Sequence, residues 1–175
     1  MSLLELITSR RSIRSFSSKL VDNEDLLRIL NAARLAPSGG NRQKWKFICV
    51  TDPKTLRMVK NSSPGFYGDA PAAIVIGLEE DDSSDKTISL LDIGFTAENI
   101  LLAAHSLGLG GCAIASFITQ SIKRVVNSPD NFEPILIISI GYPSKVPKTP
   151  KKKTLFEIVY LNEYGKNWKI AEEFT

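Results

Sequence analysis

The sequence is poor in the residues that build zinc and hydrolytic sites, with one histidine and two cysteines among 175 residues. A zinc site draws mainly on Cys and His ligands, and a Ser-His-Asp triad needs a histidine beside its serine. Cys49 and Cys112 lie inside apolar segments at no metal-ligand spacing, so we expect buried free thiols in a reducing cytoplasm. His105 lies in a helical pattern that is otherwise apolar, and we expect it to be structural. The sequence therefore predicts neither a metal centre nor a triad.

The sequence also lacks a strong charge and a long apolar run. The net charge of +3 is too small for a nucleic-acid-binding domain, which needs a contiguous basic face. The first apolar run ends at Arg10 and Arg11, and no apolar stretch approaches the roughly 20 residues of a membrane span. With 43% hydrophobic and 23% charged residues, the composition is that of a soluble globular protein. We expect one cytoplasmic domain over residues 1–175 that binds neither nucleic acid nor a membrane.

Helical and strand patterns alternate along the chain. Asp22 is placed to cap a helix that stops at Pro37, and apolar spacing predicts further helices after Pro53 and over residues 88–107 and 120–126. Short apolar runs predict strands over residues 46–51, 72–78, 112–117 and 134–140. Residues 144–175 have no core pattern but contain five aromatic residues, Phe156, Tyr160, Tyr164, Trp168 and Phe174. We expect this extended segment to dock on the core or on a partner subunit.

Three polar blocks stand out against this background. The first is Arg10, Arg11, Ser12 and Arg14, the second is a loop of small and polar residues over 36–45, and the third is the lysine run 151–153. The planar guanidinium matches two phosphate oxygens at once. A phosphate at one end and hydrogen-bonding heteroatoms at the other describe a flavin mononucleotide (FMN) better than a bare phosphate.

The glycine run 108–111 is not a dinucleotide fingerprint, because it follows a helix and opens a strand, whereas the fingerprint follows a strand and opens a helix. We expect it to end the helix and to allow close packing. Asp92 and Glu98, on the longest helix, are expected to be surface or interface polar groups. Tyr67 and Phe66 could line a substrate pocket.

Four segments carry a resemblance to a known family. RRSIRSF, APSGGNRQKWKFICV, GLGGCAIASF and GYPSKVPKTPKKKTLFEIV occur in this order between about Leu3 and Val159, and together they resemble the nitroreductase family of FMN-dependent oxidoreductases. The resemblance implies an α+β, three-layer fold with a small mixed, mostly antiparallel sheet flanked by helices. It also implies an intertwined homodimer with FMN at the subunit interface, in which residues 144–175 dock on the partner subunit.

The resemblance implies a role for each block. Arg10, Arg11, Ser12 and Arg14 would contact the phosphate, ribityl chain and pyrimidine of FMN, with Arg14 the arginine most suited to a purely structural ion pair. Lys152, and with it Lys153, would contact the phosphate. The loop that caps the flavin, usually from the neighbouring subunit, would use Pro37, Ser38, Gly39, Asn41 and Gln43. Backbone groups along the ring would come from Ala113, Ile114, Ala115 and Ser116, with an amide near Ser116 directed at N5.

Two departures from the family pattern qualify these roles. Lys44 precedes Trp45 where a proline is usual, and Ala115 offers no polar side chain. Trp45 itself is expected in the core.

The activity implied is hydride transfer from NADH or NADPH, through flavin N5, to a small electron-poor acceptor such as a nitroaromatic or a quinone, in a ping-pong order. No catalytic side chain is required, because the cofactor carries the chemistry. Two alternatives stay open. One is a specialised flavoenzyme of the same fold that performs dehalogenation, flavin fragmentation or a specific dehydrogenation. The other is a non-enzymatic module whose basic clusters bind an anionic partner. The sequence does not decide between NADH and NADPH or identify the acceptor.

Overall fold

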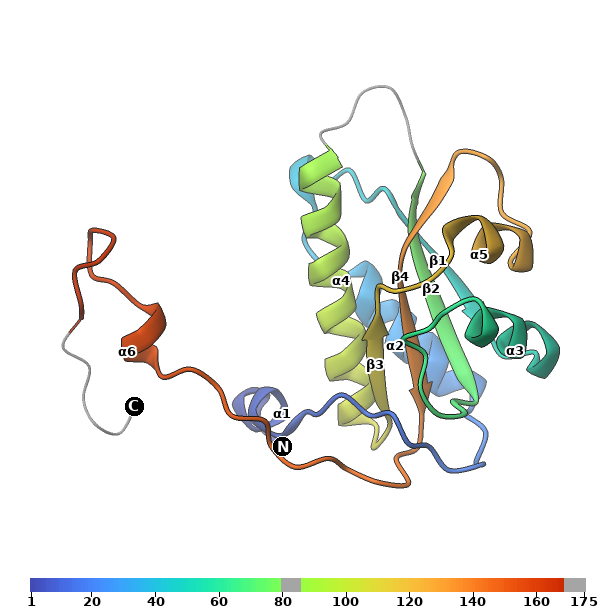
Figure 1. Cartoon of the computed structure of the whole chain (residues 1–175), viewed down its shortest axis with the longest axis horizontal. Helices are drawn as coiled ribbons and strands as arrows, with labels where there is room; N and C mark the ends of the chain where they lie inside the picture. The colour runs from blue at the N-terminus through green and yellow to red at the C-terminus, as the bar shows by residue number, and fades with distance from the viewer. Residues whose placement is uncertain (80–85, 169–175) are drawn as a thin grey trace.

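A four-stranded antiparallel sheet forms the centre of the molecule. The computed structural model describes residues 1–79 and 86–168. The sheet consists of β1 (Trp45–Val50), β2 (Ala72–Glu79), β3 (Gly110–Ile114) and β4 (Phe132–Gly141) in the order β1-β2-β4-β3 (Figure 1). All three strand pairs are antiparallel, and one parallel bridge joins Ser12 to Gly111 at the edge of β3. The expected sheet is therefore present, and its parallel part is this single bridge.

Helices cover both faces of the sheet and make the three layers. α2 (Asn23–Arg34) and α4 (Lys86–Ser106) pack on one face, and α3 (Pro53–Asn61) and α5 (Thr119–Val125) on the other (Figure 1). Alternation along a strand sends successive side chains to opposite layers: Ile74 and Ile76 join the α2 and α4 side, whereas Val75 joins the α3 and α5 side. The strand and helix patterns of the sequence are confirmed, with shifted bounds. Strand β3 begins two residues earlier than expected and ends at Ile114, so residues 115–117 are not strand, and β4 also begins two residues earlier.

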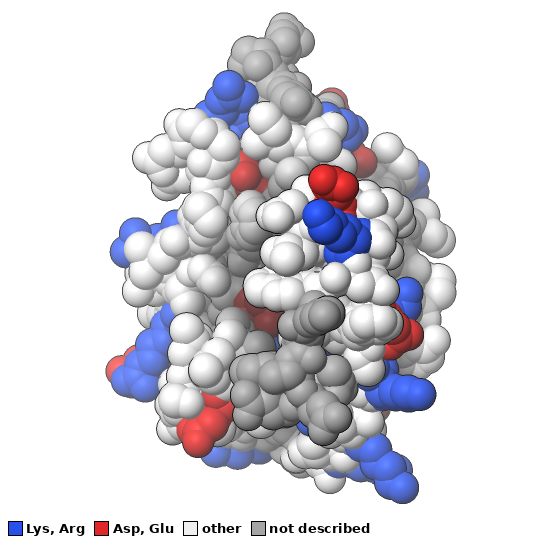
Figure 2. Space-filling model, turned by 90° about the vertical axis from the view of Figure 1, so that its left-hand side faces the viewer, with Lys and Arg blue, Asp and Glu red and all other residues white. Residues whose placement is uncertain are grey.

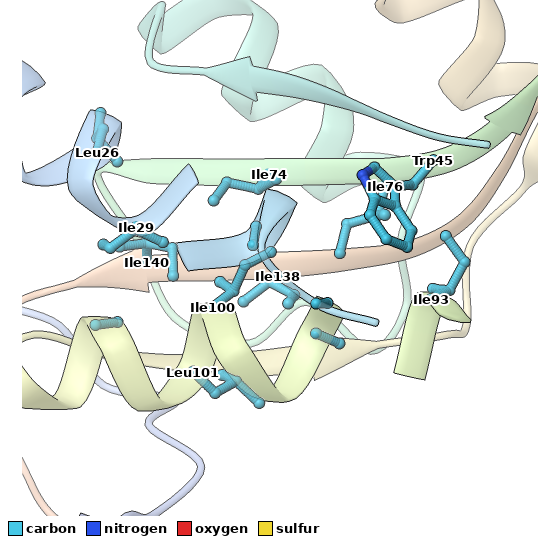
Figure 3. Packing of buried hydrophobic residues seen from close by; sticks show 14 of the residues in the cluster. Leu26, Ile29, Trp45, Ile74, Ile76, Ile93, Ile100, Leu101, Ile138 and Ile140 are labelled. Carbon is cyan, nitrogen blue, oxygen red and sulfur yellow. The ribbon is translucent and has the colours of Figure 1, made fainter. Parts of the chain in front are cut away.

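Helix α4 is the main core helix. Its length and composition would also suit a membrane span, contrary to the expectation from the apolar runs alone. Its inner face, however, packs on the sheet and on α2 through Ile93, Ile100 and Leu101, which Figure 3 shows among the buried residues of this layer. Trp45 is buried in the same cluster, as predicted. The apolar character of α4 therefore serves core packing in this fold.

Two segments at the chain ends carry exposed apolar side chains. Helix α1 (Leu3–Ser9), which the sequence reasoning did not predict, starts with a capping box between Ser2 and Glu5 and buries none of its residues. The C-terminal segment stays on the body at its start, where the Ser144 amide donates to the Ser15 carbonyl at 3.0 Å and Arg11 donates to Thr149. Over residues 153–168 it leaves the body, with the short helix α6 (Leu155–Ile158) along its path (Figure 1). Phe174 lies outside the described residues.

Charge is dispersed on the side from which this segment projects. In Figure 2, most of the visible Lys and Arg lie around the margin of that face with acidic groups among them, and one basic group lies beside an acidic group nearer the middle.

Two expectations about buried and exposed groups are wrong. Cys49 is exposed, whereas Cys112 is buried as predicted. Alternation places Val50 on the α3 and α5 side of the sheet and Cys49 on the α2 and α4 side, and Cys49 is exposed near the end of β1, an edge strand. Asp92, expected at the surface or at an interface, is only 6% exposed in this chain.

Candidate functional site

The first basic block lies along the edge of β3. After α1, the chain runs beside the strand, and the Ile13 amide donates a hydrogen bond to the Gly111 carbonyl at 2.9 Å. Ile13 is buried, so the extended backbone turns its neighbours Ser12 and Arg14 away from the core. A Cβ on Gly110 would lie 2.3 Å from Ile13 Cγ1, so glycine is needed for this close approach. We call residues 10–14 the arginine segment.

The glycine run that precedes this contact has two functions. Gly108 has a φ of +75°, the left-handed conformation that commonly ends a helix, whereas Gly110 and Gly111 already belong to β3. Both parts of the sequence interpretation, helix termination and close packing, are confirmed.

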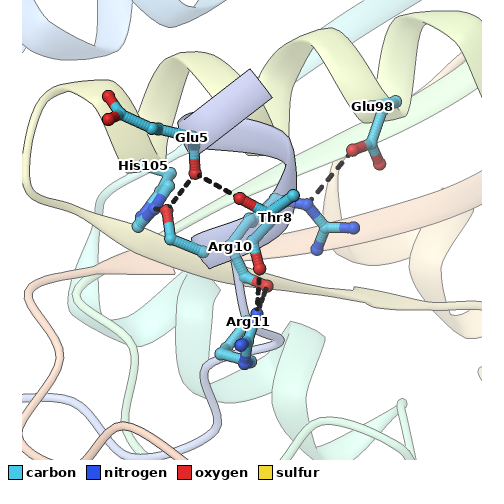
Figure 4. Close-up of polar contacts among 7 residues, drawn as sticks. Glu5, Thr8, Arg10, Arg11, Glu98 and His105 are labelled. Atoms are coloured by element: carbon cyan, nitrogen blue, oxygen red, sulfur yellow. Dashed lines mark hydrogen bonds and ion pairs between the residues drawn. The ribbon is translucent and has the colours of Figure 1, made fainter. Parts of the chain in front are cut away.

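The three arginines of the arginine segment have different surroundings. Arg10 Nε donates to Glu98 Oε1 on α4 at 3.1 Å (Figure 4). Arg11 Nη1 donates to the carbonyls of Thr8 and Arg10 at 2.8 and 2.7 Å, and its Nη2 donates to Thr149 Oγ1. Arg14 is exposed and forms no ion pair with any residue that the structure describes. The structural ion pair predicted for Arg14 is thus made by Arg10, because only Arg10 lies beside an acid of α4.

His105 supports the same segment. Its Nε2 lies 2.8 Å from Ser9 Oγ, at the end of α1. Burial, and then the positive charges of Arg10 and Arg11, lower the pKa of His105. The structural role predicted for this histidine agrees with a mainly neutral imidazole that joins α1 to α4.

A cavity of about 710 Å³ brings the first and third polar blocks together. Its cationic lining residues are Arg10, Arg11, Arg14, Lys148 and Lys152, and Ser12 and Thr149 add hydroxyl groups. No Asp or Glu is among its lining residues in the described chain. Lys152, the lysine singled out in the sequence, lines the cavity, whereas Lys151 and Lys153 do not. This concentration of positive charge, with free guanidinium and ammonium donors, fits a phosphate group.

Lys148 and Thr149 were missed by the sequence reasoning. The only signal for them was the Pro- and Lys-rich composition of the segment after β4. The hydrogen bond from Arg11 to Thr149 explains their position, because it ties residues 147–150 to the arginine segment.

The polar loop lies elsewhere in the same chain. Its backbone contact with α4 is at Gly39, whose amide donates to Asp92, whereas the arginine segment contacts α4 at Glu98 through Arg10. Asp92 and Glu98 are six residues apart, which is roughly 9 Å along a helix axis, and no residue of the polar loop lines the cationic cavity. Within one chain, therefore, the structure does not bring Pro37, Ser38, Gly39, Asn41 and Gln43 to the cationic cavity.

The end of β3 presents free backbone donors beside the arginine segment. Ala113, Ala115 and Ser116 are exposed, whereas the Ile114 side chain is in the core. Among the residues that the structure describes, none accepts a hydrogen bond from the amides of Ala115 or Ser116. These amides can donate to a ligand.

The loop before β2 closes this region. A Cβ on Gly65 would lie 2.3 Å from Ser116 Oγ, and one on Gly68 would lie 2.3 Å from the Arg14 carbonyl oxygen. Between these two contacts Tyr67 is exposed, while Phe66 is buried in the core. Of the two aromatic residues considered for a pocket, only Tyr67 is placed to meet a ligand.

Comparisons with known proteins agree with this geometry. The family model described as the nitroreductase family matches residues 7–63 and 57–142. The chain belongs to the nitroreductase family. The predicted family and its α+β fold are thereby confirmed.

Individual relatives align over most of the chain. It is 34% identical over 157 residues to a protein of Methanothermobacter thermautotrophicus whose name suggests an NADH dehydrogenase or NAD(P)H nitroreductase; the match covers 85% of this chain and 81% of that one. It is 26% identical over 183 residues to the FMN reductase (NADPH) of Bacillus subtilis, covering 90% and 74%. The solved structure of an FMN-dependent nitroreductase from Clostridium difficile R20291 matches with a TM-score of 0.83 at 30% identity, covering 93% and 100%.

Proposed function

We propose that this nitroreductase-family protein is a cytoplasmic, FMN-dependent NAD(P)H oxidoreductase that reduces small electron-poor molecules such as nitroaromatics or quinones. The observation that carries the proposal is the cationic cavity, in which two basic blocks some 140 residues apart in the sequence meet, with no acidic lining residue in the described part of the chain. The names of the relatives, which include an FMN reductase (NADPH), support the choice of cofactor and reductant.

The residues present fit FMN. Arg14, Lys148 and Lys152 would hold the dianionic phosphate, with Ser12 as a neutral donor, since all of them line the cavity. Arg10 and Arg11 also line it, but Arg10 Nε and the Arg11 guanidinium already bind protein groups. We infer that these two contribute mainly positive charge and rigidity. Lys153 would contribute only to the surrounding potential.

A second copy of the chain completes the site in this proposal. Because no residue of the polar loop lines the cavity of its own chain, the loop that meets the flavin ring would come from the partner. Apolar side chains suited to cover such an interface are exposed on α1, on α4 and on the C-terminal segment: Leu3, Leu4, Ile7, Leu91, Phe95, Phe156 and Ile158. Residues 144–175 would then dock on the partner subunit, and dimer formation and FMN binding would reinforce each other.

When bound, FMN supplies the two-electron chemistry between NAD(P)H and the acceptor, in the ping-pong order that the family resemblance implies. The chain binds and orients it. The cationic side chains near the arginine segment would stabilise negative charge on the ligand, and the amide of Ser116 or Ala115 would donate a hydrogen bond to the flavin at N5. No side chain is required to donate a proton.

A binding experiment tests the proposal. Purified protein, loaded with FMN and desalted, should retain visible flavin absorption, and either NADH or NADPH should bleach it without oxygen. Lys152→Ala should weaken FMN binding about ten-fold, because an exposed charge-assisted hydrogen bond contributes at the low end of roughly 1.5–3 kcal/mol. Lys151→Ala, one residue away and outside the cavity lining, is the matched control. Retention of no flavin by the wild-type protein would refute the proposal.

A further inference from the structure

Asp92 is a buried carboxylate that the proposed chemistry does not use. It lies on the apolar helix α4 and is 6% exposed. The Gly39 amide donates to its Oδ1 at 3.1 Å and to its Oδ2 at 3.3 Å. A carboxylate is costly to bury, and its hydrogen bonds offset only part of that cost. The position therefore calls for a reason other than core stability.

Asp92 holds a loop whose backbone is strained. Gly40, Asn41 and Gln43 have φ values of +58°, +55° and +49°. Glycine adopts this left-handed conformation freely and Asn tolerates it, but for Gln it is uncommon and persists only where the surroundings enforce it. Residues with enforced, unfavourable backbone angles are concentrated at binding and active sites.

The loop is held from inside and presents polar groups outside. The Gln43 amide donates to Ser38 Oγ at 3.1 Å, and Gln43 Nε2 donates to Asn41 Oδ1 at 3.0 Å. Gly39 lies directly on α4, because a Cβ there would come 2.3 Å from Ile88 Cγ2. The side chains of Asn41 and Gln43 nevertheless remain exposed. The loop is thus a preorganised polar surface attached to the core at Gly39.

We propose that Asp92 is a positioning residue for the ring end of the flavin site. By fixing the Gly39 peptide, it holds residues 38–43 in the conformation that meets the neutral heteroatoms of the flavin. This inference rests on the proposed function. It places Asp92 at the opposite end of the ligand from the phosphate-binding cations, so the two groups should affect binding in different ways.

Binding of two ligands distinguishes effects at the ring end of the site from effects at the phosphate end. FMN has both the ring and the phosphate, whereas riboflavin has the ring without the phosphate. Dissociation constants of both are measured on flavin-free protein by quenching of flavin fluorescence. Asp92→Asn should raise the dissociation constants of FMN and riboflavin equally, by about ten-fold, since it replaces a charge-assisted hydrogen bond with a neutral one. Arg14→Ala should weaken the binding of FMN but not that of riboflavin, which has no phosphate.

Two further variants complete the design. Asp52→Asn is the matched control, because the Asp52 carboxylate also accepts a backbone amide, from Thr55 at 2.8 Å, but at the start of the remote helix α3. Its flavin affinities should equal those of the wild type. Gly40→Ala strains the loop without touching Asp92 or the core, since only the Arg42 side chain lies near its Cβ. It should reproduce the equal loss of both ligands even if Asp92→Asn folds poorly.

The outcomes are distinguishable. Failure of the wild-type protein to bind FMN would refute the proposed function. Wild-type binding with unchanged affinities in Asp92→Asn and Gly40→Ala would overturn the role of Asp92 alone. A loss of affinity for FMN but not for riboflavin in Asp92→Asn would also overturn this role, because the substitution would then act at the phosphate.

Discussion

Replacement of Phe156 by alanine should weaken the proposed homodimer without unfolding the subunit. Phe156 lies on α6, in the segment that leaves the body, and is 51% exposed in the single chain. Burying a whole phenylalanine side chain contributes roughly 1.5–3 kcal/mol, so covering the exposed half contributes about 0.8–1.5 kcal/mol. A two-fold dimer buries the residue twice. The expected loss is therefore about 1.5–3 kcal/mol, which is roughly a ten- to hundred-fold rise in the dimer dissociation constant.

Sedimentation velocity over a dilution series, with and without FMN, measures this change. FMN should restore part of the dimer, because a ligand bound across the interface stabilises the assembled form. Met58→Ala is the control: Met58 is 44% exposed on α3, on the side of the sheet away from α4. Unaltered dimerisation of Phe156→Ala, or an equal loss in Met58→Ala, would refute the assignment of the C-terminal segment to the interface.

Three further predictions concern stability. Gly111→Ala should lower the free energy of unfolding in urea by about 1–3 kcal/mol, because its Cβ would lie 2.5 Å from a backbone oxygen. Gly94→Ala, in open space on α4, should raise it by up to about 1 kcal/mol, and equal effects of the two substitutions would contradict this reasoning. Ile138→Ala, fully buried, should cost about 2–5 kcal/mol, and the exposed Leu27→Ala under about 0.5 kcal/mol. Because the pKa of His105 is lowered on folding, the unfolded chain binds its proton at higher pH, so stability should fall as the pH is lowered from neutrality through the ordinary histidine pKa of about 6.5. The His105→Gln variant should lose less stability than the wild type over that interval, and an identical pH profile of the two proteins would exclude the histidine as the cause.

The elements and the family could be predicted from the sequence because their signals are local. Apolar periodicity distinguishes the strands from the helices within a few residues, and glycines and prolines mark their ends. The positive charge of the arginine block can likewise be predicted from the sequence, because a guanidinium remains charged in any surrounding. Helix α1 escaped prediction because none of its apolar side chains is buried, so its seven residues show only a short run.

The sequence by itself thus determined the order of the elements, the cationic character of the basic blocks and the polar, hydrogen-bonding character of the loop. Only the tertiary structure decided which partner or cavity each of these side chains contacts. It assigned Arg10 to Glu98 and Arg11 to Thr149, and it brought Lys152 rather than Lys153 to the cavity. It buried Asp92 against Gly39 of the polar loop and kept that loop out of the lining of the cationic cavity of its own chain. The physical reason is that these contacts join residues up to 140 positions apart, and their geometry depends on strand register and helix packing, which no local pattern encodes.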